Sequence, residues 1–155
     1  IVHVRDGREI IEVSTFRAAS ETKPKQTGKD LFQLGSTDQI IRDNQFGSIA
    51  EDAFRRDFTV NALYYDIKDF SLIDYTGGLE DLKQRKLKMI GDPLQRYRED
   101  PVRMIRAIRL AAKLAFELDP DTADPIKENA KLLQDVSPAR LFEEVNKLFL
   151  AGYGH

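Results

Sequence analysis

Arg-Arg-Asp-Phe-Thr-Val-Asn-Ala, residues 55–62, packs two guanidinium groups, a carboxylate and an amide around one predicted helix-to-strand junction. Arginine forks suit phosphate oxygens, an aspartate accepts from ribose hydroxyls or helps to place a metal, and an asparagine can bridge the two. The alternative explanation for such a dense cluster is a network of salt bridges that only stabilises the fold. The composition of this segment makes Arg55, Arg56, Asp57 and Asn61 candidates for binding a nucleotide.

Helix and strand signals stand on both sides of this segment. Ser48 followed by Glu51 has the spacing of a capping box and predicts a short helix that ends at about Arg55. The elements expected next are a strand pair at 62–67 and 70–74, a helix at 79–84 and a strand at 86–90. The first half is therefore predicted to be a mixed sheet with short helices.

A predicted hairpin opens the chain. Apolar, β-branched runs at 1–4 and 10–16 are joined by the residues 5–8, whose Asp-Gly pair is a strong hairpin signal. Glu12 is the only acid inside the second run, and strand alternation places it on the opposite face from its apolar neighbours. A lone carboxylate in such a position is usually just solvated. The polar stretch from 18 to about 44 is predicted to be a long loop.

The second half, after Gly91, is predicted to be helical. Asp100 supplies an N-cap and Pro101 the first helical position of a long helix. The apolar residues expected to form its core face are Val102, Ile105, Ile108, Ala112 and Ala115. The basic residues expected on other faces are Arg103, Arg106, Arg109 and Lys113. Further proline-started helix signals are Asp119-Pro120, Asp124-Pro125 and Ser137-Pro138. A basic stripe is more often a solvated face than a nucleotide clamp.

The composition restricts the kinds of partner. The 155 residues carry a formal net charge of -2, so a nucleic acid must be held by a local basic cluster and not by the field of the whole protein. No run approaches the roughly 20 consecutive apolar residues of a membrane span. The absence of cysteine excludes disulfides and thiolate metal sites and favours a cytoplasmic location.

Beyond these local patterns, the chain resembles the class of nucleotidyltransferases that holds bacterial poly(A) polymerases and CCA-adding enzymes. The resemblance covers nearly the whole length in five blocks, at residues 9–17, 51–62, 74–82, 98–107 and 137–144. It implies an α+β fold with a mixed or antiparallel sheet. It also implies two domains, with the C-terminal part of a catalytic head at 1–90 and an all-helical, base-recognising neck at 91–155.

The resemblance implies template-independent transfer of AMP from ATP to an RNA 3′ end, supported by two Mg²⁺ ions. It assigns catalysis to Asp57 and Glu12, with Glu12 as the third acid beside an Asp-x-Asp pair on a preceding strand. That pair is absent from this sequence, so Glu12 is expected to form only a partial metal site. Both ends are interpreted as cut ends, and the fragment alone is expected to be inactive.

The resemblance also assigns the contacts to ATP. Asp100 and Arg103 would read the base edge, because an aspartate accepts from an exocyclic amine and an arginine donates to a ring nitrogen. Arg106 would orient that pair. The residues assigned to nucleotide binding are Arg55, Arg56, Asn61, Asp100, Arg103 and Arg106. No signal for an oligomeric state is found.

Within the class, three segments favour poly(A) polymerase over the alternative of a CCA-adding enzyme. They are residues 42–47, the Leu-Tyr-Tyr at 63–65, and the Asp-Pro at 100–101. A non-catalytic nucleotide- or RNA-binding module is an alternative from a different class. A helical protein-interaction domain would explain the second half but would leave the Arg-Arg-Asp block without a purpose.

Overall fold

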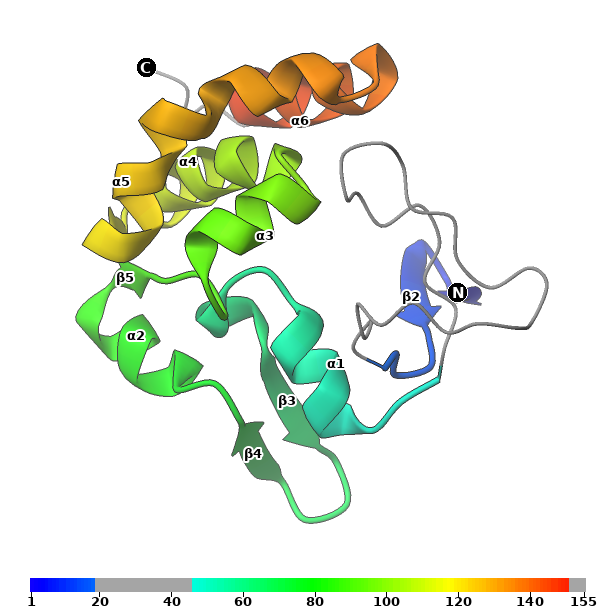
Figure 1. Cartoon of the computed structure of the whole chain (residues 1–155). Helices are drawn as coiled ribbons and strands as arrows, with labels where there is room; N and C mark the ends of the chain where they lie inside the picture. Colours follow the sequence, from blue (N-terminus) through cyan, green and yellow to red (C-terminus); the bar gives the residue numbers. More distant parts are fainter. Residues whose placement is uncertain (19–45, 151–155) are drawn as a thin grey trace, which may run out of the picture.

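The computed structural model describes residues 1–18 and 46–150 and has an α+β fold (Figure 1). In chain order its elements are β1 (Val2–Asp6), β2 (Glu9–Val13), α1 (Ile49–Arg55), the 3-10 helix η1 (Thr59–Asn61), β3 (Leu63–Asp66), β4 (Ser71–Asp74), α2 (Gly78–Gln84), β5 (Lys86–Leu87), α3 (Pro93–Glu99), α4 (Val102–Leu114), β6 (Glu117–Leu118), α5 (Pro120–Asn129), the 3-10 helix η2 (Ala130–Asp135) and α6 (Pro138–Leu150). Helices α3 to α6 stack in the upper part of the view, and α1, α2 and the β3–β4 hairpin lie below them. The predicted fold class is confirmed.

The N-terminal hairpin forms as predicted, with a shift at its turn. Asp6 pairs with Glu9 across the antiparallel ladder, so the turn consists of Gly7 and Arg8. Gly7 has a φ of +59°, a left-handed conformation that glycine adopts without steric penalty. Both faces of this hairpin are exposed. The long loop predicted for 18–44 lies almost wholly outside the described residues.

Helix α1 begins with the predicted capping box. The Glu51 N–H donates to Ser48 Oγ at 3.3 Å, and the Glu51 carboxylate accepts from the Ser48 N–H at 2.7 Å. These reciprocal bonds satisfy donors that a helix start leaves unpaired. The helix ends at Arg55, and the backbone is extended at Arg56. The Arg-Arg-Asp residues therefore stand at the C-terminal end of α1.

The predicted strand pair forms as the antiparallel β3–β4 hairpin, and a tight turn leads from it into α2. The Asp74 carboxylate organises this turn by accepting backbone N–H bonds of 2.9–3.1 Å from Thr76, Gly77, Gly78 and Leu79. A Cβ atom added to Gly78 would lie 2.1 Å from the Thr59 carbonyl oxygen. Only glycine therefore allows α2 to pack this closely against η1.

The strand predicted at 86–90 is shorter than expected. β5 ends at Leu87 and pairs in parallel with β6, across the two helices α3 and α4. Met89, beyond the end of β5, instead forms an isolated bridge with Phe58. Because the chain must turn toward Phe58 here, it cannot continue the β5 ladder.

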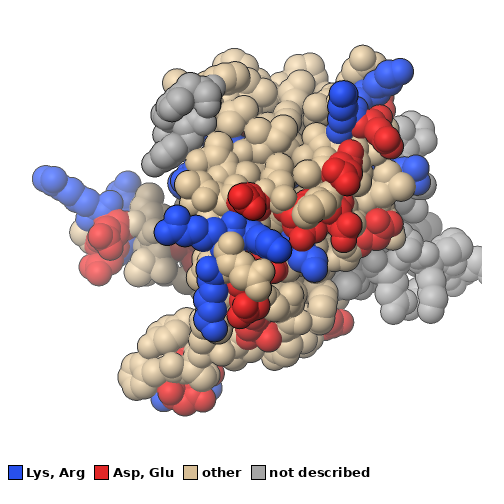
Figure 2. All heavy atoms as spheres, turned by 90° about the vertical axis from the view of Figure 1, so that its left-hand side faces the viewer, with Lys and Arg blue, Asp and Glu red and all other residues tan. Residues whose placement is uncertain are grey.

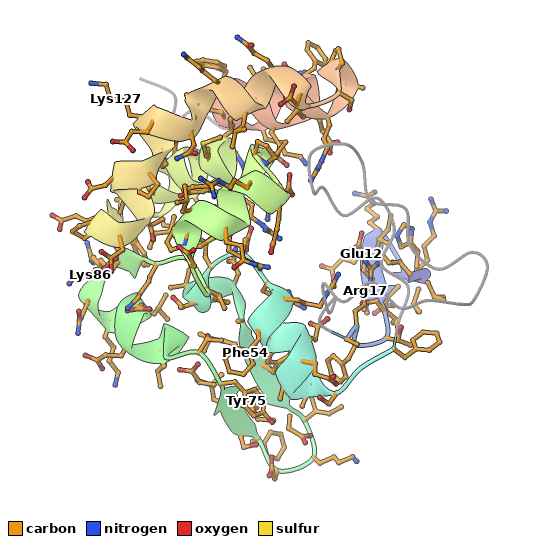
Figure 3. All side chains as sticks on the ribbon, viewed as in Figure 1. Glu12, Arg17, Phe54, Tyr75, Lys86 and Lys127 are labelled. Carbon is orange, nitrogen blue, oxygen red and sulfur yellow. The ribbon has the colours of Figure 1, made fainter. Side chains whose placement is uncertain are left out.

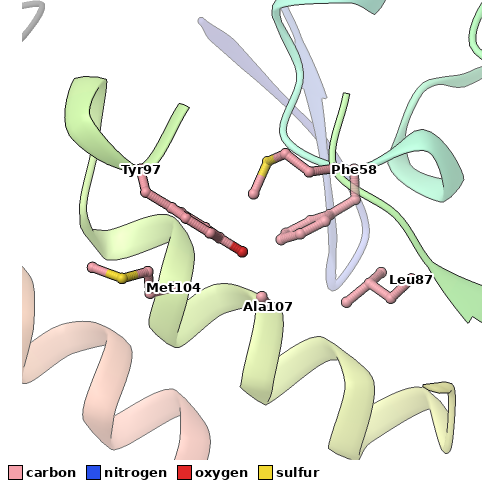
Figure 4. Packing of buried hydrophobic residues seen from close by; sticks show 6 residues of the cluster. Phe58, Leu87, Tyr97, Met104 and Ala107 are labelled. Carbon is pink, nitrogen blue, oxygen red and sulfur yellow. The ribbon is translucent and has the colours of Figure 1, made fainter. Parts of the chain in front are cut away.

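The main hydrophobic core lies where the Arg-Arg-Asp segment meets the helices (Figure 4). Its buried members are Phe58, Leu87, Met89, Tyr97, Met104 and Ala107. The Tyr97 hydroxyl donates to the Thr122 carbonyl oxygen at 2.7 Å, and Thr122 Oγ1 accepts from the Met89 N–H at 2.9 Å. Side chains from both sides of residue 90 share this core, and the division into two domains stays a prediction.

Three expectations about the helices are wrong. Asp100 is the C-cap of α3 and not the N-cap of α4, which begins at Val102 after Pro101. Of the residues expected on the core face of α4, Ile108, Ala112 and the C-cap Ala115 are exposed. The buried positions are Val102, Met104 and Ala107. The core face continues into the C-terminal turns of α4 through Leu110 and Ala111, which pack against the buried cluster. The helical period is therefore present, but the core face is rotated from the predicted one. Pro125 lies inside α5 and does not start a helix.

In the described part of the chain, no helix has the length and apolar character needed to cross a membrane.

Candidate nucleotide-binding cleft

Six arginine side chains converge on one cleft of about 680 Å³. The cleft lies between the segment after β2 and the end of α1 on one side and α4 and α6 on the other. The arginines that line it are Arg17, Arg55, Arg56, Arg103, Arg106 and Arg140. The acids that line the same cleft are Asp52, Asp57, Asp100, Glu143 and Glu144. The left-hand side of Figure 1, turned to the viewer in Figure 2, also carries interspersed basic and acidic side chains. The cleft therefore differs from that surface in the number of its arginines, which exceed its acids by one.

Asp57 lies at the centre of the hydrogen bonds in this cleft. Its carboxylate accepts from the Phe58 N–H at 2.9 Å, from Asn61 Nδ2 at 3.1 Å and from Arg106 Nε at 2.8 Å. Burial alone would raise the pKa of Asp57, but the Arg106 charge and these hydrogen bonds outweigh it and hold the pKa below its ordinary value. Asp57 is therefore ionised at neutral pH and joins the end of α1 to α4.

Arg56 is held by a second acid. Its guanidinium donates to Asp52 Oδ2 from Nε at 3.1 Å and from Nη2 at 3.0 Å, and it lies 5.4 Å above the centre of the Tyr64 ring. Asp52 accepts two further hydrogen bonds, from the Tyr64 hydroxyl at 2.8 Å and from the backbone N–H of Arg17 at 3.2 Å. Asp52 therefore fixes Arg56 and attaches the segment after β2 to α1. Arg55 and Asn61 line the cleft beside this cluster.

The predicted base-reading residues lie at the junction of α3 and α4. Arg103 Nη1 donates to Glu99 Oε2 at 3.3 Å and to the Arg96 carbonyl oxygen at 3.0 Å. The Asp100 carboxylate accepts from the Val102 N–H at 3.3 Å and from Arg140 Nη2 at 2.6 Å. Both side chains line the cleft, and each has a partner that fixes its orientation.

Arg106 connects Asp57 to a buried acid on α6. Its Nη1 lies 3.5 Å from Glu144 Oε1, and Arg109 Nε donates to the other oxygen of Glu144 at 3.3 Å. Burial would lower the pKa of Arg106, but Asp57 and Glu144 raise it above its ordinary value. Glu144 is 8% exposed and also lies 3.2 Å from Lys147. This acid therefore sets the position of α4 relative to α6.

Glu12 is the one predicted site residue that the structure does not bring to the cleft. Its side chain is 68% exposed, and its carboxylate lies 3.5 Å from His3 Nε2 across the hairpin. Figure 3 shows it on β2, apart from the helices that carry the base-side residues. Across residues 1–18 and 46–150, no three Asp, Glu, His or Cys side chains are arranged to hold a metal ion.

Sequence reasoning missed several residues that organise the cleft, chiefly Arg96, Arg140 and Glu144. Arg140 and Glu144 stand in the block at 137–144, which carried the resemblance without any assigned role. Arg109 was expected on a face other than the core face, without an assigned role. Its side chain is 14% exposed and paired with Glu144. Their partners are about 35 to 41 residues away in the chain, beyond any local periodicity.

Two family models match the chain. The model of the poly A polymerase head domain matches residues 1–88, and a model described as a probable RNA and SrmB-binding site of polymerase A matches residues 115–155. The poly(A) polymerase I of Escherichia coli O6:H1 is 54% identical over 155 residues, which cover all of this chain and 33% of that protein. The CCA-adding enzyme of Bacillus licheniformis is 41% identical over 140 residues, 90% of this chain and 32% of that enzyme.

Solved structures of related enzymes share the fold. The Bacillus stearothermophilus CCA-adding enzyme in complex with CTP superposes with a TM-score of 0.75 at 33% identity, over 98% of this chain and 33% of that one. A tRNA nucleotidyltransferase complexed with a primer tRNA and an incoming ATP analog has a TM-score of 0.59 at 38% identity, over 66% of this chain and 31% of that one. The chain spans about a third of the length of the curated relatives it matches.

Proposed function

Because this chain belongs to the family of the poly A polymerase head domain, we propose that the protein transfers AMP from ATP to the 3′ ends of RNA. The observation that carries the proposal is the shared cleft, in which Asp57 and Arg106, 49 residues apart, join the Arg-Arg-Asp end of α1 to the helix α4. In this reaction the RNA 3′ oxygen forms a bond to the α-phosphorus of ATP. The bond between the α-phosphorus and the oxygen that bridges the α- and β-phosphates breaks, and pyrophosphate leaves.

The cleft residues fit the two ends of such a substrate. Arg55 and Arg56 would face the triphosphate, because guanidinium forks donate paired hydrogen bonds to phosphate oxygens. Asn61 would accept from and donate to the ribose, beside the Asp57 carboxylate. At the other end, Asp100 would accept a hydrogen bond from the base edge and Arg103 would donate one to it. Arg106 lies between these base-side residues and the phosphate-side residues.

The described residues do not fit the two Mg²⁺ ions that the family implies. Two divalent ions need clustered carboxylates. Glu12 lies on the exposed hairpin beside His3, and Asp57 is enclosed by Arg106 and Asn61. Residues 1–18 and 46–150 therefore do not form a two-metal site by themselves.

The choice between two products rests on the similarity to relatives. Poly(A) polymerase I matches this chain at 54% identity, and the CCA-adding enzyme of B. licheniformis at 41%. We therefore propose polyadenylation as the function. Addition of C-C-A to transfer RNA is the alternative, favoured by the fold of the B. stearothermophilus enzyme. We further propose a head at 1–90 and a helical neck at 91–155, and a cytoplasmic location on the ground of the cysteine-free sequence.

The test is incorporation of ATP, CTP and GTP onto an RNA primer with magnesium, using the complete protein that carries this sequence. Long extension with ATP alone is the expected result. A short C-C-A end on transfer RNA would instead support the alternative, and ATP binding without incorporation would identify a non-catalytic module. Lys83→Ala serves as a control, because Lys83 is an exposed residue of α2 that does not line the cleft.

A further inference from the structure

We propose that Arg96 is a positioning residue that couples base recognition by Arg103 to the phosphate side of the cleft at the end of α1. The inference rests on the proposed function and adds to it a residue that does not itself line the cleft. Arg96 belongs to α3, and its bonds reach both the segment that carries Arg55 and Arg56 and the acid that holds Arg103.

The first contact of Arg96 is with the end of α1. Its Nη2 donates to the carbonyl oxygens of Arg55 at 2.7 Å and Arg56 at 2.6 Å. The last carbonyl groups of a helix lack partners within the helix and carry partial negative charge. A buried guanidinium is well suited to satisfy both. Because these carbonyls belong to the two residues directly before Asp57, Arg96 fixes the backbone from which the phosphate-side side chains project.

The second contact of Arg96 is with Glu99, one turn further along α3. Arg96 Nη1 donates to Glu99 Oε2 at 3.2 Å, and the same oxygen accepts from Arg103 Nη1 at 3.3 Å. Arg103 Nη1 also donates to the backbone carbonyl of Arg96 at 3.0 Å. The orientation of Arg103 is therefore set by both the side chain and the main chain of residue 96.

Arg96, Glu99 and Arg103 form a relay of hydrogen bonds, and their burial indicates that each side chain is held in one orientation. The side chains of Arg96, Glu99 and Arg103 are 14%, 16% and 14% exposed. Arg96 Nε is buried and has no hydrogen-bond partner in the described part of the chain. A buried donor without a partner costs free energy, so the position of the guanidinium is determined by its Nη1 and Nη2 contacts. A lysine has one nitrogen and cannot span these acceptors as the arginine fork does.

The coupling has a direct consequence for base selection. A site rejects the wrong base when its donors and acceptors are fixed at the correct distance from the rest of the bound substrate. The Arg96 relay sets that distance between the α1 end and Arg103. Without it, both ends of the cleft keep their side chains, but their spacing is no longer fixed and the discrimination between bases falls.

The test compares Arg96→Lys with Arg98→Lys, a control on the same helix whose side chain is exposed. In the complete protein, kcat and KM are measured with ATP and with CTP. We expect Arg96→Lys to lower the ratio of kcat/KM for ATP over CTP about tenfold and to raise the KM for ATP, whereas Arg98→Lys leaves both unchanged. A purely structural role would reduce kcat equally for both nucleotides, with unchanged KM and ratio, and would overturn the proposal.

A second variant keeps the proposal testable if Arg96→Lys folds poorly. Glu99→Gln leaves the bonds of Arg96 to α1 in place but weakens its link to Arg103, and it should lower the same ratio. The double variant should lose little more than either single variant, because both interrupt one relay. Additive losses would overturn the coupling. An inactive wild-type protein would refute the proposed function instead, so the two failures are distinguishable.

Discussion

Replacement of Asp57 by asparagine tests the central ion pair of the cleft. Asparagine has the same shape, but it has no charge, and its amide nitrogen would face the N–H groups of Arg106 or Asn61. The variant loses two charge-assisted bonds to Arg106, each contributing roughly 1.5 kcal/mol. Because the Arg106 side chain is 32% exposed, water compensates for part of this loss. We expect a loss of about 2 kcal/mol in the free energy of unfolding, or roughly 6 °C in the Tm of a cooperative unit as long as this chain.

The assay is thermal unfolding of the complete protein, followed by circular dichroism, with Asp124→Asn as the matched control. Asp124 is an exposed acid on α5, so its replacement should shift the Tm by less than about 1 °C. The double variant Asp57→Asn/Arg106→Met should recover part of the lost stability, because it no longer leaves Nε and Nη2 of Arg106 without the carboxylate that they bind. Equal Tm values for Asp57→Asn and Asp124→Asn would refute the reasoning.

Three further predictions concern the elements around the cleft. Ser48→Ala should cost about 1 kcal/mol in the free energy of unfolding, because it removes the N-cap of α1; a urea titration against wild type checks this, and an unchanged midpoint would contradict it. Gly78→Ala should destabilise by more than about 2 kcal/mol, because its Cβ would meet the Thr59 carbonyl at 2.1 Å; a Tm within 1 °C of wild type would show that α2 can move away. The pKa values of Asp52 and Asp57 lie below their ordinary value of 3.8, despite burial, because of hydrogen bonds to Asp52 and the Arg106 charge beside Asp57. Their contribution to stability is complete above that value and is lost as the pH falls below it; a Tm that stays flat from pH 6 to pH 2 would exclude it.

Local signals in the sequence predicted most of the fold. The capping box at Ser48, the β3–β4 pair and the N-terminal hairpin all depend on residues within a few positions of one another. The errors arise where tertiary packing decides. Ile108 follows the helical period of α4 but stays 45% exposed, and Pro125 is accommodated within α5.

The candidate site was predictable only as a set of residues. The density of charge at 55–62 marked the phosphate side, and the resemblance added Asp100, Arg103 and Arg106. The pairing of these groups was not predictable, because Asp57 meets Arg106 and Asp100 meets Arg140 over separations of 49 and 40 residues. The same reason explains why Arg96 and Glu144 were not recognised.

The parallel pairing of β5 with β6 implies an order of folding, in which the helices α3 and α4 between these strands pack before the strands pair. These strands meet through the bonds from Glu117 N to Arg85 O at 2.9 Å and from Asp119 N to Leu87 O at 3.0 Å. Closing the roughly 30 residues between them costs about 3 kcal/mol of chain entropy, more than two backbone bonds return. The strands can therefore pair only once α3 and α4 are packed on the core. Hydrogen exchange should show the amides of Glu117 and Asp119 opening together with those of α4, as one cooperative unit.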